Sequence, residues 1–158
     1  MSKSDPPRPR VVEGKRTFSI VASQFNARYV QGLVDHAEKE LRAFAPNATI
    51  SIQRVPGAFE IPVVVRELAS QKKTDAIIAC GVILKGKTDH AQNLSRSVTD
   101  ALQRIAVDHA VPVINAVLSF DDETQACERC LENKINRGTG AARAAVEIAR
   151  VMSELRGE

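Results

Sequence analysis

The chain has 158 residues, of which 44% are hydrophobic and 26% are charged, and its formal net charge is +3 at pH 7. This length and composition are typical of one globular domain and exclude a disordered or fibrous protein. Its apolar runs fall short of the roughly 18–20 residues that cross a bilayer, and residues 1–16 lack the apolar stretch of a secretory signal. We expect a flexible basic arm over residues 1–16 and one domain over residues 17–158.

The composition also bears on partners and location. Basic and acidic residues are interleaved, and the chain has one Tyr and no Trp to stack on bases, so we expect no nucleic-acid partner. The three cysteines are an odd number, and reduced thiols are the usual state in a cytoplasmic protein. Cys127 and Cys130 form a C-x-x-C motif without a second cysteine pair or a nearby histidine. This pattern favours two helical thiols over a redox dithiol or a metal site.

Strand-like and helix-like segments alternate in the first half of the chain. An apolar strand is predicted over Thr17–Ser23, and apolar residues at helical spacing predict a helix over Arg28–Phe44. The alternating pattern of Ala48–Val55 indicates a second strand. A sharp turn follows at Pro56-Gly57, and a proline suited to a first helical turn opens a helix over Pro62–Gln71.

The same alternation continues to the end of the chain. Asp75–Leu84 is a continuous apolar run, as expected of a strand that is buried on both faces. The remaining predicted elements are a helix over Asp89–His109, a buried strand over Pro112–Leu118, a short helix near Thr124–Leu131, a turn at Asn136–Gly138 and an Ala-rich helix to about Leu155.

Alternating strands and helices form βαβ units with right-handed crossovers. We therefore expect an α/β fold whose parallel sheet is covered by helices on both faces. Ligands bind such a sheet beyond the carboxyl ends of its strands. That rule selects four segments for a site: Ser23–Asn26, Val55–Glu60, Gly81–His90 and Asn115–Asp122.

The segment Gly81–Thr88 reads GVILKGKT and formally matches the P-loop pattern G-x-x-x-x-G-K-[ST]. With Asp121-Asp122 as the Mg²⁺-binding acids, it would indicate a nucleotidase. Val82, Ile83 and Leu84 are large and apolar, however, and they continue the strand. A phosphate cradle instead needs small or polar residues that expose consecutive N–H groups, so the P-loop is the weaker hypothesis.

The stronger hypothesis places an anion at the helix start that follows this loop. Gly86, Lys87 and Thr88 lie where free backbone N–H groups and the helix dipole favour a phosphate. His90, in the first turn, could transfer protons beside that phosphate near neutral pH. A solvent-exposed histidine at a helix start is the alternative that this segment leaves open.

Three further features lie close to the predicted strand ends. In the turn after the second strand, Ala58, Phe59 and Glu60 could offer main-chain groups, an apolar wall and a carboxylate to a ligand. Phe25 could stack on a planar ring. Arg129 could hold a phosphate bidentately if its guanidinium faces the ligand edge. Taken singly, each feature is also explained by packing or by a solvated surface charge.

Taken together, these segments resemble the lumazine synthase family over residues 18–155. The order and spacing of five motifs carry the resemblance: SQFN at Ser23–Asn26, VPGAFEIPVVV at Val55–Val65, GVILKGKTDH at Gly81–His90, PVINAVLSFDDETQACER at Pro112–Arg129 and NRGTGAA at Asn136–Ala142. The resemblance implies a flavodoxin-like three-layer sandwich with a four-stranded parallel sheet. It also implies a role in riboflavin biosynthesis. There, 5-amino-6-(D-ribitylamino)uracil condenses with 3,4-dihydroxy-2-butanone 4-phosphate to 6,7-dimethyl-8-ribityllumazine, without a metal or an organic cofactor.

The resemblance further implies a role for each matching residue. His90 would transfer protons, and the butanone phosphate would be held by Lys87, Thr88 and Arg129. The ribitylaminouracil would be bound by Phe25, Ala58, Phe59, Glu60, Val82, Ile83, Leu84 and Asn115.

The chain departs from the usual family pattern at three places. The residues after His90 are Ala91, Gln92 and Asn93, where the family usually carries an aromatic residue and an acid. Lys87 replaces a small residue, and Asn115 stands where a Phe commonly closes the pyrimidine pocket. These differences concern the aromatic lining and the substrate affinity rather than the reaction centre.

The resemblance also implies an assembly. Family members form homopentamers with active sites between neighbouring subunits, and some build sixty-subunit shells from twelve pentamers. The segment CLENKIN before the last helix lacks the glycine that shell-forming members often have there, which favours an isolated pentamer. Riboflavin synthase is a candidate partner, and we expect neither nucleic acid nor a membrane as a partner.

Overall fold

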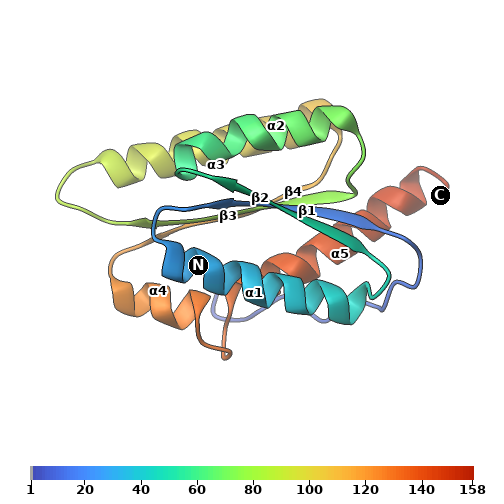
Figure 1. The fold of residues 1–158 in the computed structure, drawn as a ribbon, viewed down its shortest axis with the longest axis horizontal. Coiled ribbons are helices and arrows are strands. Elements are labelled where there is room, and N and C mark those ends of the chain that lie inside the picture. The colour runs from blue at the N-terminus through green and yellow to red at the C-terminus, as the bar shows by residue number, and fades with distance from the viewer. Residues whose placement is uncertain (1) are drawn as a thin grey trace.

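The computed structural model describes residues 2–158. Its strands form one parallel sheet in the order β2-β1-β3-β4, with α2 and α3 on one face and α1, α4 and α5 on the other (Figure 1). The predicted α/β fold with a four-stranded parallel sheet is confirmed. The elements are β1 (Thr17–Ser23), α1 (Ala27–Phe44), β2 (Thr49–Val55), the 3-10 helix η1 (Ala58–Glu60), α2 (Ile61–Gln71), β3 (Ala76–Leu84), α3 (His90–His109), β4 (Val113–Phe120), α4 (Glu123–Cys130) and α5 (Arg137–Leu155).

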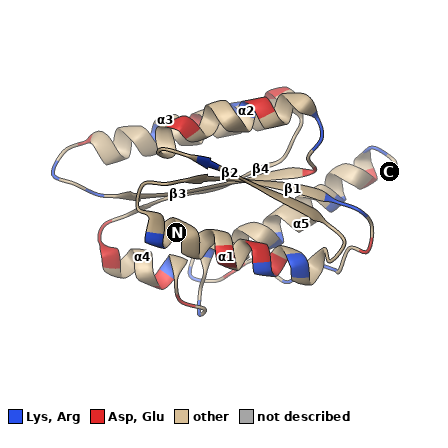
Figure 2. Ribbon diagram, viewed as in Figure 1, with Lys and Arg blue, Asp and Glu red and all other residues tan. Residues whose placement is uncertain are grey.

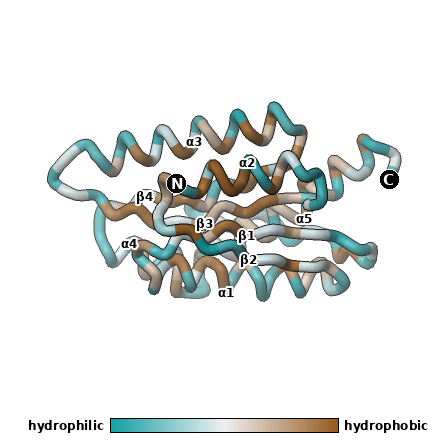
Figure 3. Tube along the Cα trace, turned by 45° about the horizontal axis from the view of Figure 1, so that its top comes forward, coloured by the Kyte–Doolittle hydropathy of each residue, from teal (hydrophilic) through white to brown (hydrophobic). Residues whose placement is uncertain are grey.

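The sheet separates two apolar cores. Side chains alternate along each strand, so Ile20 and Ile78 pack against α1 and α5, whereas Val21 and Ile77 pack against α2 and α3. Hydrophobic residues accordingly follow β3 and β4 in Figure 3. Among the residues of the four strands, Arg54 of the edge strand β2 is the one that carries a charge (Figure 2). The continuous apolar run of β3 therefore reflects burial on both faces of the sheet. The strand predicted as buried over Pro112–Leu118 is the edge strand β4, and it is only partly buried, with Asn115 and Ser119 exposed.

The helices α1 and α5 approach each other closely on one face of the sheet. A Cβ atom on Gly138 would overlap the backbone carbonyl of Leu33, and one on Gly32 would overlap that of Cys130. Gly138 therefore permits the close contact of α5 with α1, and Gly32 permits that of α1 with the end of α4; in both cases the nearest atom is a backbone oxygen.

The predicted turn at Asn136–Gly138 is wrong. Asn136 is the N-cap of α5, and its side-chain oxygen accepts hydrogen bonds from the N–H groups of Gly138 (2.8 Å) and Thr139 (3.2 Å). Arg137 and Gly138 already belong to the helix. Glycine here serves helix packing, whereas the sequence pattern was interpreted as chain reversal. The other predicted elements agree with the structure to within two residues at either end.

Residues 2–16 form no helix or strand and run along α1 and α5. The N–H of Val12 donates to the carbonyl of Phe44 at 2.7 Å, and the guanidinium of Arg143 donates to the carbonyl of Pro6 at 2.9 Å. The flexibility of the arm in solution stays a prediction, and its first residue, Met1, lies outside the described part of the chain. Within residues 2–158, no helix has both the length and the apolar character to span a membrane.

Candidate active site

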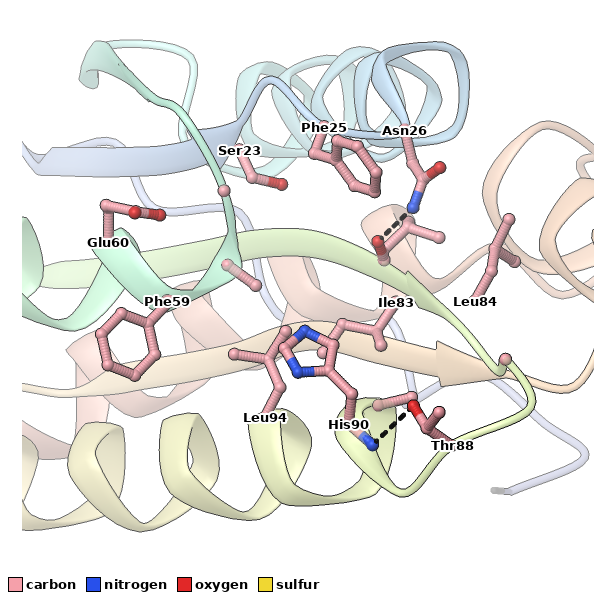
Figure 4. Close-up of a pocket in the computed structure, with 15 residues that line it drawn as sticks. Ser23, Phe25, Asn26, Phe59, Glu60, Ile83, Leu84, Thr88, His90 and Leu94 are labelled. Atoms are coloured by element: carbon pink, nitrogen blue, oxygen red, sulfur yellow. Dashed lines mark hydrogen bonds between the residues drawn. The ribbon is translucent and has the colours of Figure 1, made fainter.

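The main candidate site is a pocket of about 310 Å³ beyond the carboxyl ends of β1 and β3. In the strand order β2-β1-β3-β4, the chain leaves β1 toward one side of the sheet and later returns on the other. This reversal opens a crevice between β1 and β3, the place where parallel α/β sheets bind ligands. The pocket is lined by Ser23, Phe25, Asn26, Gly57, Ala58, Phe59, Glu60, Val82, Ile83, Leu84, Gly86, Thr88, His90, Ala91 and Leu94 (Figure 4).

All but three of the predicted site residues line this pocket. They come from the segments after β1, β2 and β3, which are far apart in the sequence and meet because parallel strands end at one edge of the sheet. The residues brought together are Phe25, Ala58, Phe59, Glu60, Val82, Ile83, Leu84, Thr88 and His90.

Two aromatic rings stand exposed at the pocket. Phe25 follows β1 and is 73% exposed, and Phe59 belongs to η1 and is 70% exposed. Exposed aromatic rings beside a concave apolar surface are typical of a site that a planar ligand or a partner covers. Val82 and Ile83 of β3, both buried, form the apolar floor near them.

The start of α3 supplies the polar side of the pocket. His90 is the first residue of the helix, and its imidazole points into the pocket (Figure 4). The N–H of His90 donates to the hydroxyl of Thr88 at 3.4 Å. The loop from Lys85 to Asp89 is exposed. A Cβ atom added to Gly86 would have no neighbour within 4 Å beyond the adjacent residues, so the loop has open space around it. Free N–H groups, an open loop and a histidine thus meet at one helix N-terminus, which suits an anion.

The same loop separates this protein from P-loop nucleotidases. The segment that matches the P-loop pattern remains in β3 through Leu84, with Val82 and Ile83 inside the strand. Its backbone N–H groups therefore belong to the sheet and cannot wrap around a phosphate. A short loop of five residues, Lys85–Asp89, is left to face a ligand.

Three predicted site residues do not line the pocket of their own subunit. Lys87 lies exposed in the loop before α3. Asn115 lies on β4, where its amide donates to the hydroxyl of Thr99 at 3.3 Å and its oxygen accepts from the N–H of Val117 at 3.0 Å. Arg129 lies half-buried in the last turn of α4.

Arg129 has a second cation nearby. Burial, together with the positive charge of Arg129, lowers the pKa of Arg137 at the start of α5. Arg137 and Asn115 border one further hollow between β4 and α5. Two guanidinium groups thus lie near each other on the α4 and α5 side of the sheet, whereas the amide of Asn115 faces Thr99 of α3 on the other side.

Sequence reasoning did not assign a role to several residues that line the pocket. Ser23 and Asn26 belong to the SQFN segment that was singled out as a strand end, and Gly57 and Gly86 belong to the neighbouring loops. Leu94 could have been found from its spacing, because residue i+4 shares a helix face with His90. Asn26 could have been found as a residue type that ends a strand and begins a helix.

The cysteines lie away from the pocket. Burial raises the pKa of the Cys80 thiol to about 12, and burial with a smaller effect of Cys127 raises that of Cys130 to about 12. All three thiols are free. Cys130 is buried in the core while Cys127 is partly exposed, which supports the interpretation of C-x-x-C as two helical thiols. In residues 2–158, no three His, Cys, Asp or Glu side chains gather as a metal-binding group.

Comparison with known proteins decides among the families that such a pocket permits. The sequence profile of the 6,7-dimethyl-8-ribityllumazine synthase family matches residues 15–153. The chain belongs to this family. A protein named 6,7-dimethyl-8-ribityllumazine synthase from Azoarcus sp. (strain BH72) is 36% identical over 137 residues, which span 86% of this chain and 85% of that protein.

Membership of the lumazine synthase family confirms the resemblance drawn from the five motifs. The matched region includes every element from β1 to α4 and all of α5 except its last residues. The P-loop pattern over Gly81–Thr88 is thus an incidental feature of the end of β3 and the loop that follows it.

Proposed function

We propose that this protein makes 6,7-dimethyl-8-ribityllumazine in riboflavin biosynthesis, as a transferase. The amine of 5-amino-6-(D-ribitylamino)uracil condenses with 3,4-dihydroxy-2-butanone 4-phosphate, and phosphate and water leave. The observation that carries this proposal is one pocket with an aromatic side, made by Phe25 and Phe59, and an anion-binding side, made by the start of α3 with His90.

The pocket suits the ribitylaminouracil on its aromatic side. The exposed ring of Phe25 offers a stacking surface for the planar pyrimidine, and Val82–Leu84 offers the edge of a strand. Ala58, Phe59 and Glu60 offer main-chain groups and a carboxylate, which suit the hydroxyl-rich ribityl chain. Stacking of an aromatic pair contributes about 0.5–1.5 kcal/mol in addition to the free energy gained by burying its apolar surface.

The phosphate of the second substrate suits the loop before α3. Thr88 and the free N–H groups at the helix start donate to it, and the dipole of α3 favours its negative charge. Lys87, exposed on the same loop, adds a positive charge.

His90 is the proposed proton-transfer group. Condensation of an amine with a ketone moves protons from nitrogen to the departing water, and loss of phosphate takes another proton from carbon. An imidazole changes its protonation near neutral pH, so it can accept and return these protons. Holding two reactive substrates side by side supplies part of the rate without any acid or base.

We further propose that the active site is shared between subunits of a homopentamer. Arg129 and Asn115 do not reach the His90 pocket of their own chain, and the exposed rings of Phe25 and Phe59 lie uncovered in the single subunit. Both facts are accounted for if a neighbour adds its Arg129 and Asn115 to this pocket. An isolated pentamer is the assembly we favour over a sixty-subunit shell.

The remaining proposals concern the setting of the enzyme. We place it in the cytoplasm, which its free thiols support. Riboflavin synthase, which would consume the product, is a candidate partner. Residues 17–158 form the catalytic domain, and residues 1–16 are a flexible arm before it.

An absorbance assay tests the activity. Purified protein is mixed with both substrates in a chelator-treated buffer without nucleotide, and formation of the lumazine is followed against the spontaneous reaction. We expect product well above the spontaneous rate. Turnover that requires ATP and Mg²⁺, or no product above the spontaneous rate, would contradict the proposal.

A further inference from the structure

The turn between β1 and α1 depends on a single asparagine. Asn26 has φ 57° and ψ 44°, in the left-handed region, and α1 begins at the next residue. Residues with a Cβ seldom adopt this conformation, and asparagine is among the few that tolerate it. The chain therefore reverses direction in one residue, immediately after Phe25. The orientation of that exposed ring depends on the geometry of this turn.

The side chain of Asn26 also connects the turn to the neighbouring strand. Its Nδ2 donates to the carbonyl of Val82 at 2.7 Å, in a partly buried position (Figure 4). The pairing of β1 with β3 ends at Ala22 and Cys80. Val82 lies two residues further along β3, so its carbonyl points to the same side as that of Cys80. The backbone of β1 no longer pairs with β3 at this point. The side-chain amide of Asn26 thus supplies the donor for the hydrogen bond that would come next along β3.

The same turn is bonded to β2 on its other side. The N–H of Gln24 donates to the carbonyl of Val55 at 2.8 Å, and the N–H of Phe25 donates to that of Pro56 at 3.1 Å. The three segments that line the aromatic side of the pocket are therefore held by backbone bonds toward β2 and by one side-chain bond toward β3. The bond from Asn26 is the link that a point mutation can remove.

We propose that Asn26 is a positioning residue for the pyrimidine-binding side of the pocket. Its amide keeps the stacking ring of Phe25 at a set distance from the edge of β3 at Val82–Leu84. A planar ring bound between them needs that spacing, and neither neighbour provides it alone. The inference rests on the proposed function, because it assumes that the ribitylaminouracil occupies this side.

Two substitutions separate the hydrogen bond from the backbone conformation. Asn26→Gly and Asn26→Asp both tolerate the left-handed region, and both remove the N–H donor. At neutral pH the carboxylate of the Asp variant faces the carbonyl of Val82, and two acceptors cannot bond. At low pH the protonated carboxyl group regains an O–H donor in nearly the same place.

The expected kinetic result is a selective loss of affinity. At pH 7.5, both variants raise the KM for the ribitylaminouracil by about 3- to 10-fold, as one lost hydrogen bond predicts. We expect kcat to change less, because His90 on α3 is untouched. Measured relative to the native enzyme at each pH, the defect of Asn26→Asp shrinks as the pH falls to about 4, near the ordinary pKa of an Asp carboxyl, whereas that of Asn26→Gly persists.

A matched control uses a similar bond elsewhere in the chain. The Nδ2 of Asn47 donates to the carbonyl of Glu13 at 2.6 Å, away from the pocket. Asn47→Asp makes the same chemical change, and we expect it to leave the KM at the native value at every pH.

A measurement without substrates tests the link by itself. In the unliganded protein, we expect amide hydrogen exchange over residues 24–29 to be faster in Asn26→Gly and Asn26→Asp than in the native chain. After correction for the pH dependence of intrinsic exchange rates, we expect native exchange to return at low pH in Asn26→Asp alone. Unchanged exchange overturns the inference, as does a KM defect that is absent, or one that persists equally in both variants at about pH 4, where an Asp carboxyl is about half protonated. If the native protein forms no lumazine, the proposed function is overturned instead. Hydrogen exchange then tests by itself whether the bond from Asn26 to Val82 holds the turn in place.

Discussion

Arg129 and His90 carry different parts of the proposed reaction. Arg129 would hold the phosphate in the ground state, so losing one charge-assisted contact costs about 1.5–3 kcal/mol, or roughly 10- to 150-fold in affinity. Arg129→Ala is therefore expected mainly to raise the KM for the butanone phosphate. Steady-state kinetics with the ribitylaminouracil held saturating measures this effect.

His90 would act in the transition state. His90→Ala is expected to lower kcat, by up to the 10²- to 10⁴-fold that is typical of general acid–base catalysis. Substrate proximity supplies rate by itself, so the loss can be smaller. An unchanged kcat in His90→Ala, together with an unchanged KM in Arg129→Ala, would show that the site lies elsewhere.

The buried thiols allow a prediction that does not involve catalysis. Burial raises the pKa of Cys80 and of Cys130 to about 12, so both thiols stay protonated and unreactive at pH 8. Iodoacetamide should then modify the partly exposed Cys127 first in the native protein and all three cysteines after unfolding, as read by mass spectrometry. Modification of Cys80 in the native protein as fast as that of Cys127 would contradict this.

The raised pKa of Cys80 also makes the free energy of unfolding depend on pH in the alkaline range. An ordinary thiol ionises near pH 9, whereas Cys80 in the folded protein ionises near 12. The folded state therefore holds its proton more tightly, and the free energy of unfolding falls as the pH rises from about 9 to about 12. Urea unfolding over that pH range should show that the free energy of unfolding falls less steeply with pH in Cys80→Ala than in the native protein. Equal slopes would exclude Cys80 as the cause.

At the scale of elements, the contact between α1 and α5 sets a strict limit on side-chain size. A Cβ on Gly138 overlaps the backbone carbonyl of Leu33, which belongs to a helix and cannot yield cheaply. Gly138→Ala is expected to lower the free energy of unfolding by about 1–3 kcal/mol, the usual cost of overpacking. Urea denaturation measures the loss.

A glycine in open surroundings provides the control. Gly14 would place a Cβ with nothing within 4 Å, so Gly14→Ala is expected to leave stability almost unchanged. If Gly138→Ala matches Gly14→Ala, the two helices lie further apart than described.

At the scale of the whole molecule, the proposed pentamer has a mass of about 86 kDa, five times the subunit mass of 17.2 kDa. Light scattering at micromolar concentration should give this mass. A monomer would remove the shared site, and about twelve times the pentamer mass would indicate the sixty-subunit shell.

Hybrid assemblies test the shared site directly. His90→Ala and Arg129→Ala subunits are unfolded, mixed in equal amounts and refolded together. If each site takes His90 from one subunit and Arg129 from its neighbour, roughly a quarter of the sites regain both residues in random closed rings. Activity of the mixture that stays at the average of the two variants would place both residues in one subunit.

Local patterns in the sequence were sufficient to predict the order of strands and helices. The apolar run of β3 can be recognised because burial on both faces excludes charged residues. The turn at Asn136–Gly138 was mispredicted because glycine serves two purposes, chain reversal and close packing. Only the position of Leu33 on α1, distant in sequence, distinguishes between them.

Some features of the site could also be predicted from local sequence, whereas others depend on the tertiary structure. Residues such as His90 and Thr88 could be predicted from sequence to lie at a helix start that suits an anion, because a strand, a short polar loop and a helix start follow one another along the chain. The strand order β2-β1-β3-β4 is a tertiary property, and it alone brings Phe25 and Val82 together in one pocket. The bond from Asn26 to Val82 spans 56 residues, and the separation of Arg129 from the His90 pocket depends on where α4 packs. No local pattern encodes these distances, because they arise only once the sheet has assembled.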